Sequence, residues 1–201
     1  MLKSLLSIAV LCTSTVLLTH TPAMAQETKP TVVYNIGGNL PDLEFTLQGV
    51  DKPVSASDLK GKVVMVFFGY ASCPDICPTT MAELSAFRDE LSDAEKDKLQ
   101  IVFISVDPHR DTPAVLQAYV DAFHNGAIGL TGTDKQIAEI AKRYRVAYQI
   151  EKPKPGDDPL NYEVMHAQGV YIFDTQGKAK LLASNADNTE LIKEKIRPLL
   201  K

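Results

Sequence analysis

The fold and the chemistry of this chain are decided by one stretch, residues 63–78, which reads VVMVFFGYASCPDICP. Residues 63–68 form a continuous run of apolar, β-forming side chains, which predicts a strand buried on both faces. Pro78 suits the first turn of a helix, because its missing N–H would be unpaired there anyway. The stretch therefore predicts a buried strand that turns into a helix, with Cys73 and Cys77 at the turn.

Outward from this stretch, strands and helices alternate along the chain. Thr112 followed by Pro113 is typical of a helix start, and Thr133 with Gln136 forms a capping box. The predicted strands or extended segments are 32–36, 43–47, 63–68, 101–106, 145–150, 169–174 and 178–184, and the predicted helices are 79–91, 112–123, 133–144 and 188–199. A turn is predicted at 57–62 and a proline-rich loop at 151–159. This order predicts a layered α/β domain.

The first 25 residues have the pattern of a secretory signal peptide. Lys3 supplies a positive start, residues 5–18 form a mainly apolar run, and Ala23-Met24-Ala25 resembles a cleavage site. The run is shorter than the roughly 20 apolar residues of a membrane span. We expect cleavage after Ala25, with an uncleaved anchor as the alternative. Residues 26–31 then form a flexible lead-in, and 32–201 form the domain.

Length and charge limit the partners. A chain of 201 residues with a leader is long enough for one domain with a proper core. Its net charge of −4 argues against nucleic acid and against an anionic membrane surface. Contact with a membrane is expected only through an uncleaved leader or through a partner. Export would place the domain where disulfides persist.

Cys73 and Cys77 are the cysteines left once the leader with Cys12 is removed. Two thiols at a strand-to-helix turn can form a reversible disulfide or hold a soft metal ion. A purely structural disulfide is disfavoured, because so short a loop gains only about 2 kcal/mol against roughly 4.7 for a hundred-residue loop. We expect Cys77, near the helix N-terminus, to have a lowered pKa, and Cys73 to be the more exposed thiol.

His166 is the histidine that offers a third ligand. It directly precedes the apolar strand predicted from residue 169, where it could also be a hydrogen-bonded residue at the edge of the core. His109 and His124 lie in polar surroundings and are expected on the surface. Position alone leaves both interpretations of His166 open.

Three signatures in this sequence resemble the Sco/SenC family of proteins that assist copper insertion into cytochrome c oxidase. The first is residues 68–78 with both cysteines, the second is residues 104–113 (ISVDPHRDTP), and the third is residues 129–133 (GLTGT). His166 stands where the histidine ligand of that family would be. The resemblance implies a thioredoxin-like three-layer α/β/α domain with an N-terminal hairpin extension. It also implies one copper ion, Cu(I) or Cu(II), bound by Cys73, Cys77 and His166.

One departure concerns the residue before this histidine. The family usually has Asp there, where an acid could hold the second imidazole N–H, whereas this chain has Met165. Another acid could take over that role, and Met165 itself is expected to be a packed core residue rather than a thioether ligand. Asp75 either tunes the charge of the site or is a solvated turn residue. Asp107 and Asp111 are expected to anchor their loop without binding metal.

The leading functional hypothesis is a periplasmic metallochaperone that faces the outer side of the inner membrane. It would take copper from a periplasmic donor and pass it to the dinuclear copper centre of oxidase subunit II or another copper-accepting protein. Zinc is the competing metal for a Cys₂His site. The alternative function is a thiol–disulfide reductase that acts on the cysteines of the target through Cys73 and Cys77. A peroxidase is disfavoured, because Thr79 and Thr80 follow the cysteine pair instead of preceding it.

Overall fold

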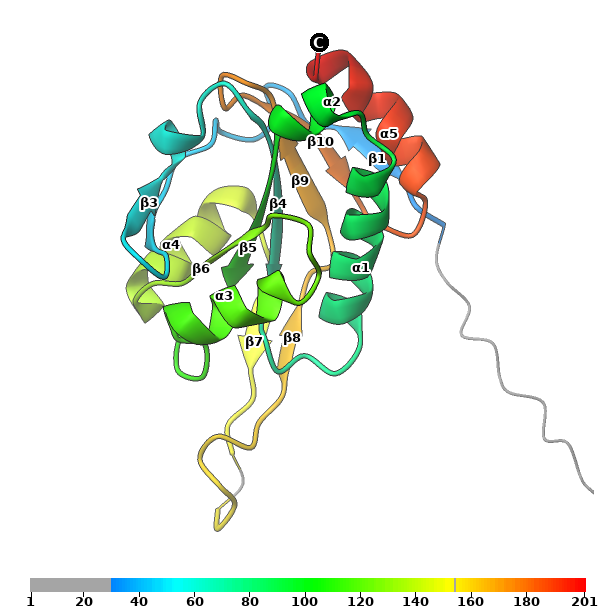
Figure 1. Cartoon of the computed structure of the whole chain (residues 1–201). Coiled ribbons are helices and arrows are strands. Elements are labelled where there is room, and N and C mark those ends of the chain that lie inside the picture. Colours follow the sequence, from blue (N-terminus) through cyan, green and yellow to red (C-terminus); the bar gives the residue numbers. More distant parts are fainter. Residues whose placement is uncertain (1–29, 154) are drawn as a thin grey trace, which may run out of the picture.

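The computed structural model describes residues 30–153 and 155–201, so the predicted leader and residues 26–29 of the predicted lead-in lie outside the described residues. Its centre is a six-stranded sheet in the order β1-β10-β9-β4-β5-β6 (Figure 1). Strands β4, β5 and β6 run parallel to one another. Strand β9 is antiparallel to β4, β10 is antiparallel to β9, and β1 is antiparallel to β10. The sheet strands are β1 (Val33–Asn35), β4 (Val63–Gly69), β5 (Leu99–Ser105), β6 (Ile128–Leu130), β9 (Val170–Phe173) and β10 (Ala179–Ala183).

Different helices cover the two faces of this sheet, which gives the predicted three layers. The helices are α1 (Ile76–Asp89), α2 (Asp93–Asp97), α3 (Pro113–Asp121), α4 (Asp134–Tyr144) and α5 (Thr189–Ile196). Helices α1, α3 and α5 lie on one face and α4 on the other (Figure 1). The short 3-10 helices are η1 (Ala56–Leu59) and η2 (Arg197–Leu199).

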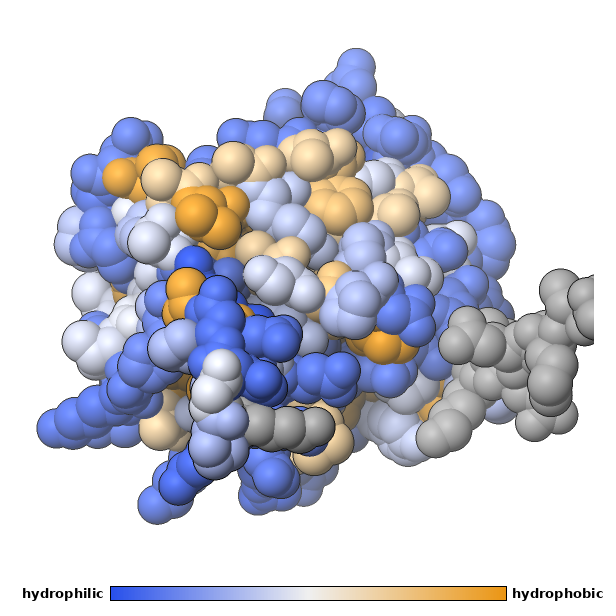
Figure 2. All heavy atoms as spheres, turned by 90° about the horizontal axis from the view of Figure 1, so that it is seen from below, coloured by the Kyte–Doolittle hydropathy of each residue, from blue (hydrophilic) through white to orange (hydrophobic). Residues whose placement is uncertain are grey.

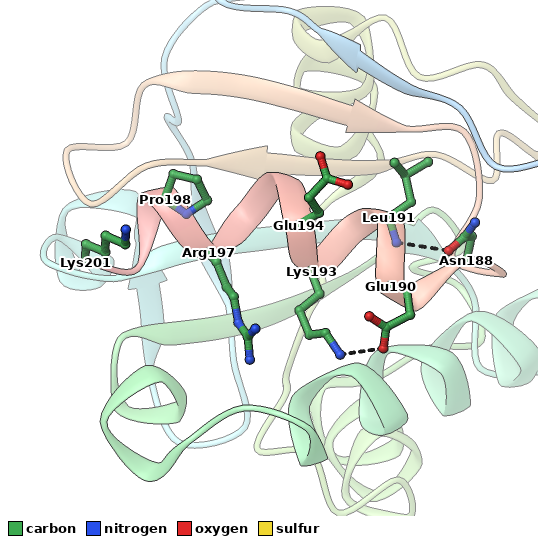
Figure 3. A pocket seen from close by; sticks show the side chains of 8 residues that line it. All are labelled: Asn188, Glu190, Leu191, Lys193, Glu194, Arg197, Pro198 and Lys201. Carbon is green, nitrogen blue, oxygen red and sulfur yellow. Dashed lines mark hydrogen bonds and ion pairs between the residues drawn. The ribbon is translucent and has the colours of Figure 1, made fainter.

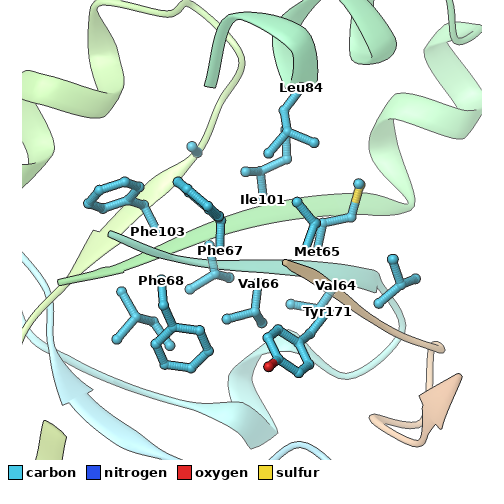
Figure 4. Packing of buried hydrophobic residues seen from close by; sticks show 14 of the residues in the cluster. Val64, Met65, Val66, Phe67, Phe68, Leu84, Ile101, Phe103 and Tyr171 are labelled. Carbon is cyan, nitrogen blue, oxygen red and sulfur yellow. The ribbon is translucent and has the colours of Figure 1, made fainter. Parts of the chain in front are cut away.

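Strand β4 is buried along its whole length, as its apolar run predicts, and supplies both halves of the core. Successive strand residues point to opposite faces. Phe67 packs edge-on against Phe103, with ring centroids 5.8 Å apart, whereas Phe68 contacts Tyr144 of α4 at 6.5 Å. Figure 4 shows Phe67 and Phe103 on one side of the strands, and Phe68 with Tyr171 on the other. The cysteine turn therefore follows a strand that is buried along its whole length.

Local capping explains why α3 and α4 begin where the sequence predicts. The Thr112 hydroxyl accepts the N–H of Val115, and Pro113 occupies the first turn of α3. Thr133 and Gln136 form the predicted capping box of α4. Helix α1 differs, because it begins at Ile76, before Pro78 and three residues before the predicted start at 79.

The N-terminal region contains a hairpin, but one of its strands was not predicted. The hairpin consists of β2 (Thr46–Gln48) and β3 (Pro53–Ser55), which pair antiparallel. The strand predicted at 32–36 instead joins the central sheet beside β10, where Ile36 N–H donates to Lys180 O at 2.9 Å. This pairing covers the edge of β10, which would otherwise leave its N–H and C=O groups unpaired. The residues at 57–62 contain the end of η1 as well as a turn.

A second two-stranded ribbon projects from the body of the domain (Figure 1). Strand β7 (Tyr148–Ile150) pairs antiparallel with β8 (Val164–His166), and His166 lies opposite Tyr148. We call these strands and the described residues between them the arm (residues 148–153 and 155–166). The sequence predicts β7 and the proline-rich loop but not β8. No helix in the described part of the chain is long and apolar enough to cross a bilayer.

Candidate metal centre

Cys73 and Cys77 lie where β4 passes into α1. The N–H of Cys73 donates to Tyr70 O at 3.2 Å, which closes the turn after the strand. Cys77 is fully buried and Cys73 half-buried, so Cys73 is the more exposed thiol, as predicted. A Cβ atom at Gly69 would lie only 2.6 Å from Cys77 Sγ. The sulfur of Cys77 therefore packs directly against the backbone of β4, where only glycine leaves room for it.

His166 reaches these sulfurs from the arm, at the end of β8. Its Nε2 atom lies 3.3 Å from Cys77 Sγ and 3.9 Å from Cys73 Sγ. The three ligand atoms all lie within 4.8 Å of one another. Ligand atoms bound to one ion at about 2.0–2.3 Å are separated by up to roughly 4.6 Å. The structure thus brings all three predicted site residues together in an arrangement that could hold one metal ion.

The imidazole of His166 is oriented with its second nitrogen already paired. His166 Nδ1 lies 3.0 Å from Ala167 O, and because a carbonyl only accepts, Nδ1 carries the proton. The lone pair of Nε2 is then left to face the two sulfurs. A backbone carbonyl therefore performs the role that the sequence led us to expect of an acid.

Met165 is not a packed core residue, which corrects the sequence prediction. Its side chain is 56% exposed. Because neighbouring strand residues point to opposite faces, Met165 points away from the face on which His166 meets the cysteines. The thioether is therefore not placed to bind an ion with them. The prediction was wrong because it treated residues 165 and 166 as the lead-in to a core strand, whereas they belong to the separate ribbon of the arm.

The helix N-terminus favours the thiolate of Cys73, whereas we expected it to favour that of Cys77. A hydrogen bond from the Cys77 thiol, with others from the N–H groups of Asp75 and Cys77, outweighs burial and lowers the pKa of Cys73 to about 3. The bond to Cys73, together with burial, raises the pKa of Cys77, because both favour its protonated form. The helix begins one residue before Cys77, which turns that side chain into the core. The sulfur of Cys73 accepts the Cys77 N–H at 3.4 Å, as a capping anion would.

Tyr70 is a further site residue, to which the sequence prediction assigned no role. It is 4% exposed, and its ring meets that of His166 edge-on, with centroids 5.7 Å apart. Burial and the neighbouring Cys73 sulfur raise the pKa of Tyr70 to about 12. Phe67 contacts the same imidazole at 6.0 Å. Two aromatic rings on the cysteine side thus hold the ring of His166, and a signal for this was the aromatic residue directly before the cysteine turn.

Asp107 and Asp111 are buried anchors of the loop between β5 and α3, as predicted. Asp111 Oδ2 accepts the N–H of Ala71 at 2.9 Å and the hydroxyl of Ser105 at 2.6 Å. Asp107 Oδ1 accepts the hydroxyl of Tyr162 at 2.7 Å. Burial raises the pKa of Asp111. One aspartate therefore fixes the cysteine turn and the other fixes the arm.

The remaining candidates lie on the surface. Asp75 is exposed and makes no capping hydrogen bond through its side chain. His109 Nε2 lies 3.3 Å from an oxygen of Asp134, with both side chains mostly exposed. His124 is also exposed. These positions agree with the solvated roles predicted for the two histidines.

Two hollows on the surface lie away from the cysteines and His166. One, of about 630 Å³, runs along α5, where Lys193 Nζ lies 2.5 Å from Glu190 Oε1 (Figure 3). The other, of about 580 Å³, lies between the arm and the loop after β5, with Leu160 and Tyr162 in its wall. Figure 2 looks onto that end of the molecule and shows isolated apolar side chains among polar ones. Neither hollow is lined by a cysteine or by His166.

The sequence is similar to those of known proteins. A family model for SCO1/SenC matches residues 38–201. The mitochondrial protein SCO2 of Saccharomyces cerevisiae is 40% identical over 148 residues, which are 73% of this chain and 48% of that protein. The chain spans about half to two thirds of the length of three curated relatives that it matches.

Solved structures agree with that match. ScoI of Bradyrhizobium japonicum with copper bound is 33% identical, with a TM-score of 0.67 over 79% of this chain and 99% of that one. BsSco, in which a disulfide switch was identified, is 25% identical, with a TM-score of 0.60 over 82% of this chain and 96% of that one. BsSco is described as a member of the Sco family of cytochrome c oxidase assembly proteins. The expected thioredoxin-like α/β fold is confirmed by these likenesses.

Proposed function

This chain belongs to the SCO1/SenC family, and on that premise we propose that it binds one copper ion through Cys73, Cys77 and His166. The observation that carries the proposal is the convergence of these three ligand atoms within 4.8 Å, from segments about ninety residues apart in the sequence. Thiolates suit Cu(I) and imidazole suits Cu(II), so the set can serve both oxidation states. A Cys₂His set also suits zinc, and the copper-bound ScoI relative favours copper.

Copper is the cargo in this proposal, and its acceptor is the dinuclear copper centre of cytochrome c oxidase subunit II. The half-buried Cys73, with its lowered pKa, is the ligand that an incoming thiolate from the acceptor would displace first. The membership of BsSco in a family of oxidase assembly proteins supports this choice of acceptor. Export by the leader at 1–25, into the periplasm, would bring the domain to the side on which a periplasmic copper donor delivers the ion.

Anaerobic copper titration of the reduced protein tests the proposal. We compare wild type with His166→Ala, and use His109→Ala as a matched control because that histidine is exposed and lies away from the sulfurs. We expect one copper per chain, absorption from sulfur-to-copper charge transfer, and a changed spectrum or weaker binding only in His166→Ala. Weak binding in wild type, or equal behaviour of the two variants, would refute a three-ligand copper site.

A thiol–disulfide reductase is the second candidate function, and the different environments of the two thiols favour it. The Cys73 thiolate would attack a disulfide of the acceptor, forming a mixed disulfide and releasing one thiolate. Cys77 would then lose its proton and attack the sulfur of Cys73, releasing the second thiolate, so that two electrons pass to the acceptor. This activity needs the cysteine pair but not His166. Retention of disulfide exchange in His166→Ala, with no copper binding in wild type, would favour the reductase over the metallochaperone.

A further inference from the structure

We propose that Arg110 positions His166 by clamping the arm against the segment that carries the cysteines. This inference rests on the proposed copper-binding role of His166. Arg110 lies in the loop between β5 and α3, and its side chain is only 14% exposed. It contacts neither sulfur and is therefore a positioning residue rather than a ligand.

The clamp begins with two backbone carbonyls of the arm. Arg110 Nη1 donates to Tyr162 O at 2.9 Å and to Leu160 O at 3.2 Å. Both carbonyls lie just before β8, whose last residue is His166. A planar guanidinium can reach two acceptors while its Nε–H binds a third group, a geometry that lysine cannot reproduce. Arg110 thus fixes the segment from which β8 starts.

A buried carboxylate holds the guanidinium in place. Arg110 Nε donates to Asp107 Oδ2, and the side chain of Asp107 is fully buried. The other oxygen of Asp107 accepts the hydroxyl of Tyr162 at 2.7 Å. Arg110, Asp107 and Tyr162 therefore form a closed set of contacts, in which the arm supplies Tyr162 and the β5–α3 loop supplies the charged pair.

Aromatic contacts extend the clamp to the metal site. The guanidinium carbon of Arg110 lies 3.9 Å from the centroid of the Tyr162 ring and 5.3 Å from that of Tyr70. Both separations fall within the range of cation–π attraction. Tyr70 in turn meets the imidazole of His166 edge-on. The guanidinium is thus in contact with one ring from the arm and one from the cysteine side.

The arm needs such a clamp because it lies outside the central sheet. Strands β7 and β8 pair with each other and form a separate two-stranded sheet. A metal ligand must be held to within about 0.5 Å of its working position. Loss of the contacts made by Arg110 would let His166 move relative to the cysteines. Cu(II), which favours imidazole, should then lose affinity, whereas Cu(I), which favours the two thiolates, should lose little.

The test is Arg110→Lys, which keeps a positive charge beside Asp107 but removes the planar fork. Arg143→Lys is the matched control, because Arg143 also pairs with a carboxylate (Glu44, 2.5 Å) and donates to a carbonyl (Asp42 O, 3.3 Å), but on α4. We expect Arg110→Lys to weaken Cu(II) binding about 10- to 100-fold. Its Cu(I) affinity should stay within about threefold of wild type, and both affinities should be unchanged in Arg143→Lys.

A double variant identifies the route of the effect. If Arg110 acts through His166, Arg110→Lys should cause no further loss of copper affinity in a His166→Ala background. Equal weakening of Cu(I) and Cu(II), or the same loss with and without His166, would overturn the proposal. Tyr162→Phe removes only the hydroxyl that contacts Asp107, so it should cause a smaller loss of Cu(II) affinity and leave Cu(I) affinity nearly unchanged. If Arg110→Lys fails to fold, this second variant tests the proposal.

Amide hydrogen exchange in the copper-free protein separates this inference from the proposed function. The N–H groups of Glu151 and Ala167 donate to Glu163 O and Ala147 O, both at 2.9 Å, and report on the pairing of β7 with β8. We expect faster exchange of both amides in Arg110→Lys, with the Val106 amide of the central body unchanged. If wild type binds no copper, the proposed function fails, but the exchange rates of wild type and Arg110→Lys still show whether Arg110 holds the arm in place. Wild-type exchange rates in the arm of Arg110→Lys would overturn it.

Discussion

The two halves of the candidate site are built in opposite ways. The cysteine segment (residues 69–77) begins at the last residue of the fully buried β4, and Cys77 Sγ packs against the strand backbone at Gly69. The arm carries His166 on a two-stranded ribbon outside the central sheet, with Leu160 and Met165 more than half exposed. The difference teaches that one half is fixed by close packing, while the other is held mainly by polar and ring contacts, with Val164 as its buried link to the core.

This contrast suits a protein that must both hold and release an ion. A sulfur buried in a dense core cannot move without disturbing its neighbours. A ligand on a ribbon held by hydrogen bonds and ring contacts can shift at far lower cost. We therefore expect changes in the cysteine segment to affect the folding of the whole domain, and changes at exposed positions of the arm to affect metal binding more than global stability.

The largest expected effect separates the two regions by stability. Phe87 lies on α1, the helix that carries Cys77, and is 1% exposed. Phe87→Ala should lower the free energy of unfolding by about 3–5 kcal/mol, through lost apolar burial and a cavity. Leu160→Ala in the arm, where the side chain is 55% exposed, should change it by no more than about 0.5 kcal/mol. Urea denaturation measures both values, and a costly Leu160→Ala would mean that the arm belongs to the core.

Gly69→Ala sharpens the comparison at the sulfur itself. The added methyl would meet Cys77 Sγ at 2.6 Å and the Phe103 ring at 3.0 Å. Overpacking of this kind costs about 1–3 kcal/mol, and we expect Cys77 to be displaced and copper binding to weaken with it. Gly37→Ala is the control, because its methyl would meet only the Asn35 side chain at 3.2 Å and a carbonyl at 3.5 Å. Equal stability of the two variants in denaturant would contradict tight packing at Gly69.

The two thiols should also differ in their dependence on pH. For an ordinary thiol, with a pKa near 8.5, the reaction rate rises about tenfold for each unit by which the pH increases toward that value, since the thiolate is the nucleophile. Because the pKa of Cys73 is about 3, alkylation of Cys73 in the reduced, copper-free protein should be almost independent of pH between about 5 and 8. Cys77, whose pKa is raised, should remain unmodified. Mass spectrometry after iodoacetamide treatment measures both rates.

Two variants test the cause of this difference. Cys77→Ala removes the hydrogen bond that lowers the pKa of Cys73 most, so this pKa should rise and the alkylation rate of Cys73 should depend on pH again. Cys77→Ser keeps a hydrogen-bond donor and should therefore preserve the low pKa of Cys73. The low pKa of Cys73 also makes the stability of the fold depend on pH. The folded pKa of Cys73 lies below its unfolded value, so its contribution to stability is complete above about 8.5 and is lost as the pH falls through the folded pKa. A tenfold rise of the alkylation rate per pH unit in wild type would show that Cys73 is an ordinary thiol.

Met165→Leu has the smallest expected effect. The side chain is exposed and points away from the cysteines, so both copper affinity and unfolding free energy should stay within the scatter of surface substitutions, about 0.5 kcal/mol. Isothermal titration with Cu(I) and urea denaturation check the two quantities. A marked loss of Cu(I) affinity would mean that the thioether reaches the ion, and that the arm can turn its other face to the site.

The sequence by itself determined the parts of this protein whose signals are local. The apolar run at 63–68 predicted the central strand, Thr112 and Thr133 predicted the starts of two helices, and the spacing of Cys73 and Cys77 predicted two thiols on one turn. Resemblance to a family added His166. These predictions succeeded because burial, capping and short spacing depend on neighbouring residues and leave a direct pattern.

Only the tertiary structure decided the features that join distant segments. It paired β1 with β10, placed Met165 on the outer face of the arm, and assigned the low pKa to Cys73 instead of Cys77. It also let the Ala167 carbonyl orient His166. Each of these depends on which groups meet across the fold, and therefore on desolvation and hydrogen-bond geometry, which spacing along a chain does not contain.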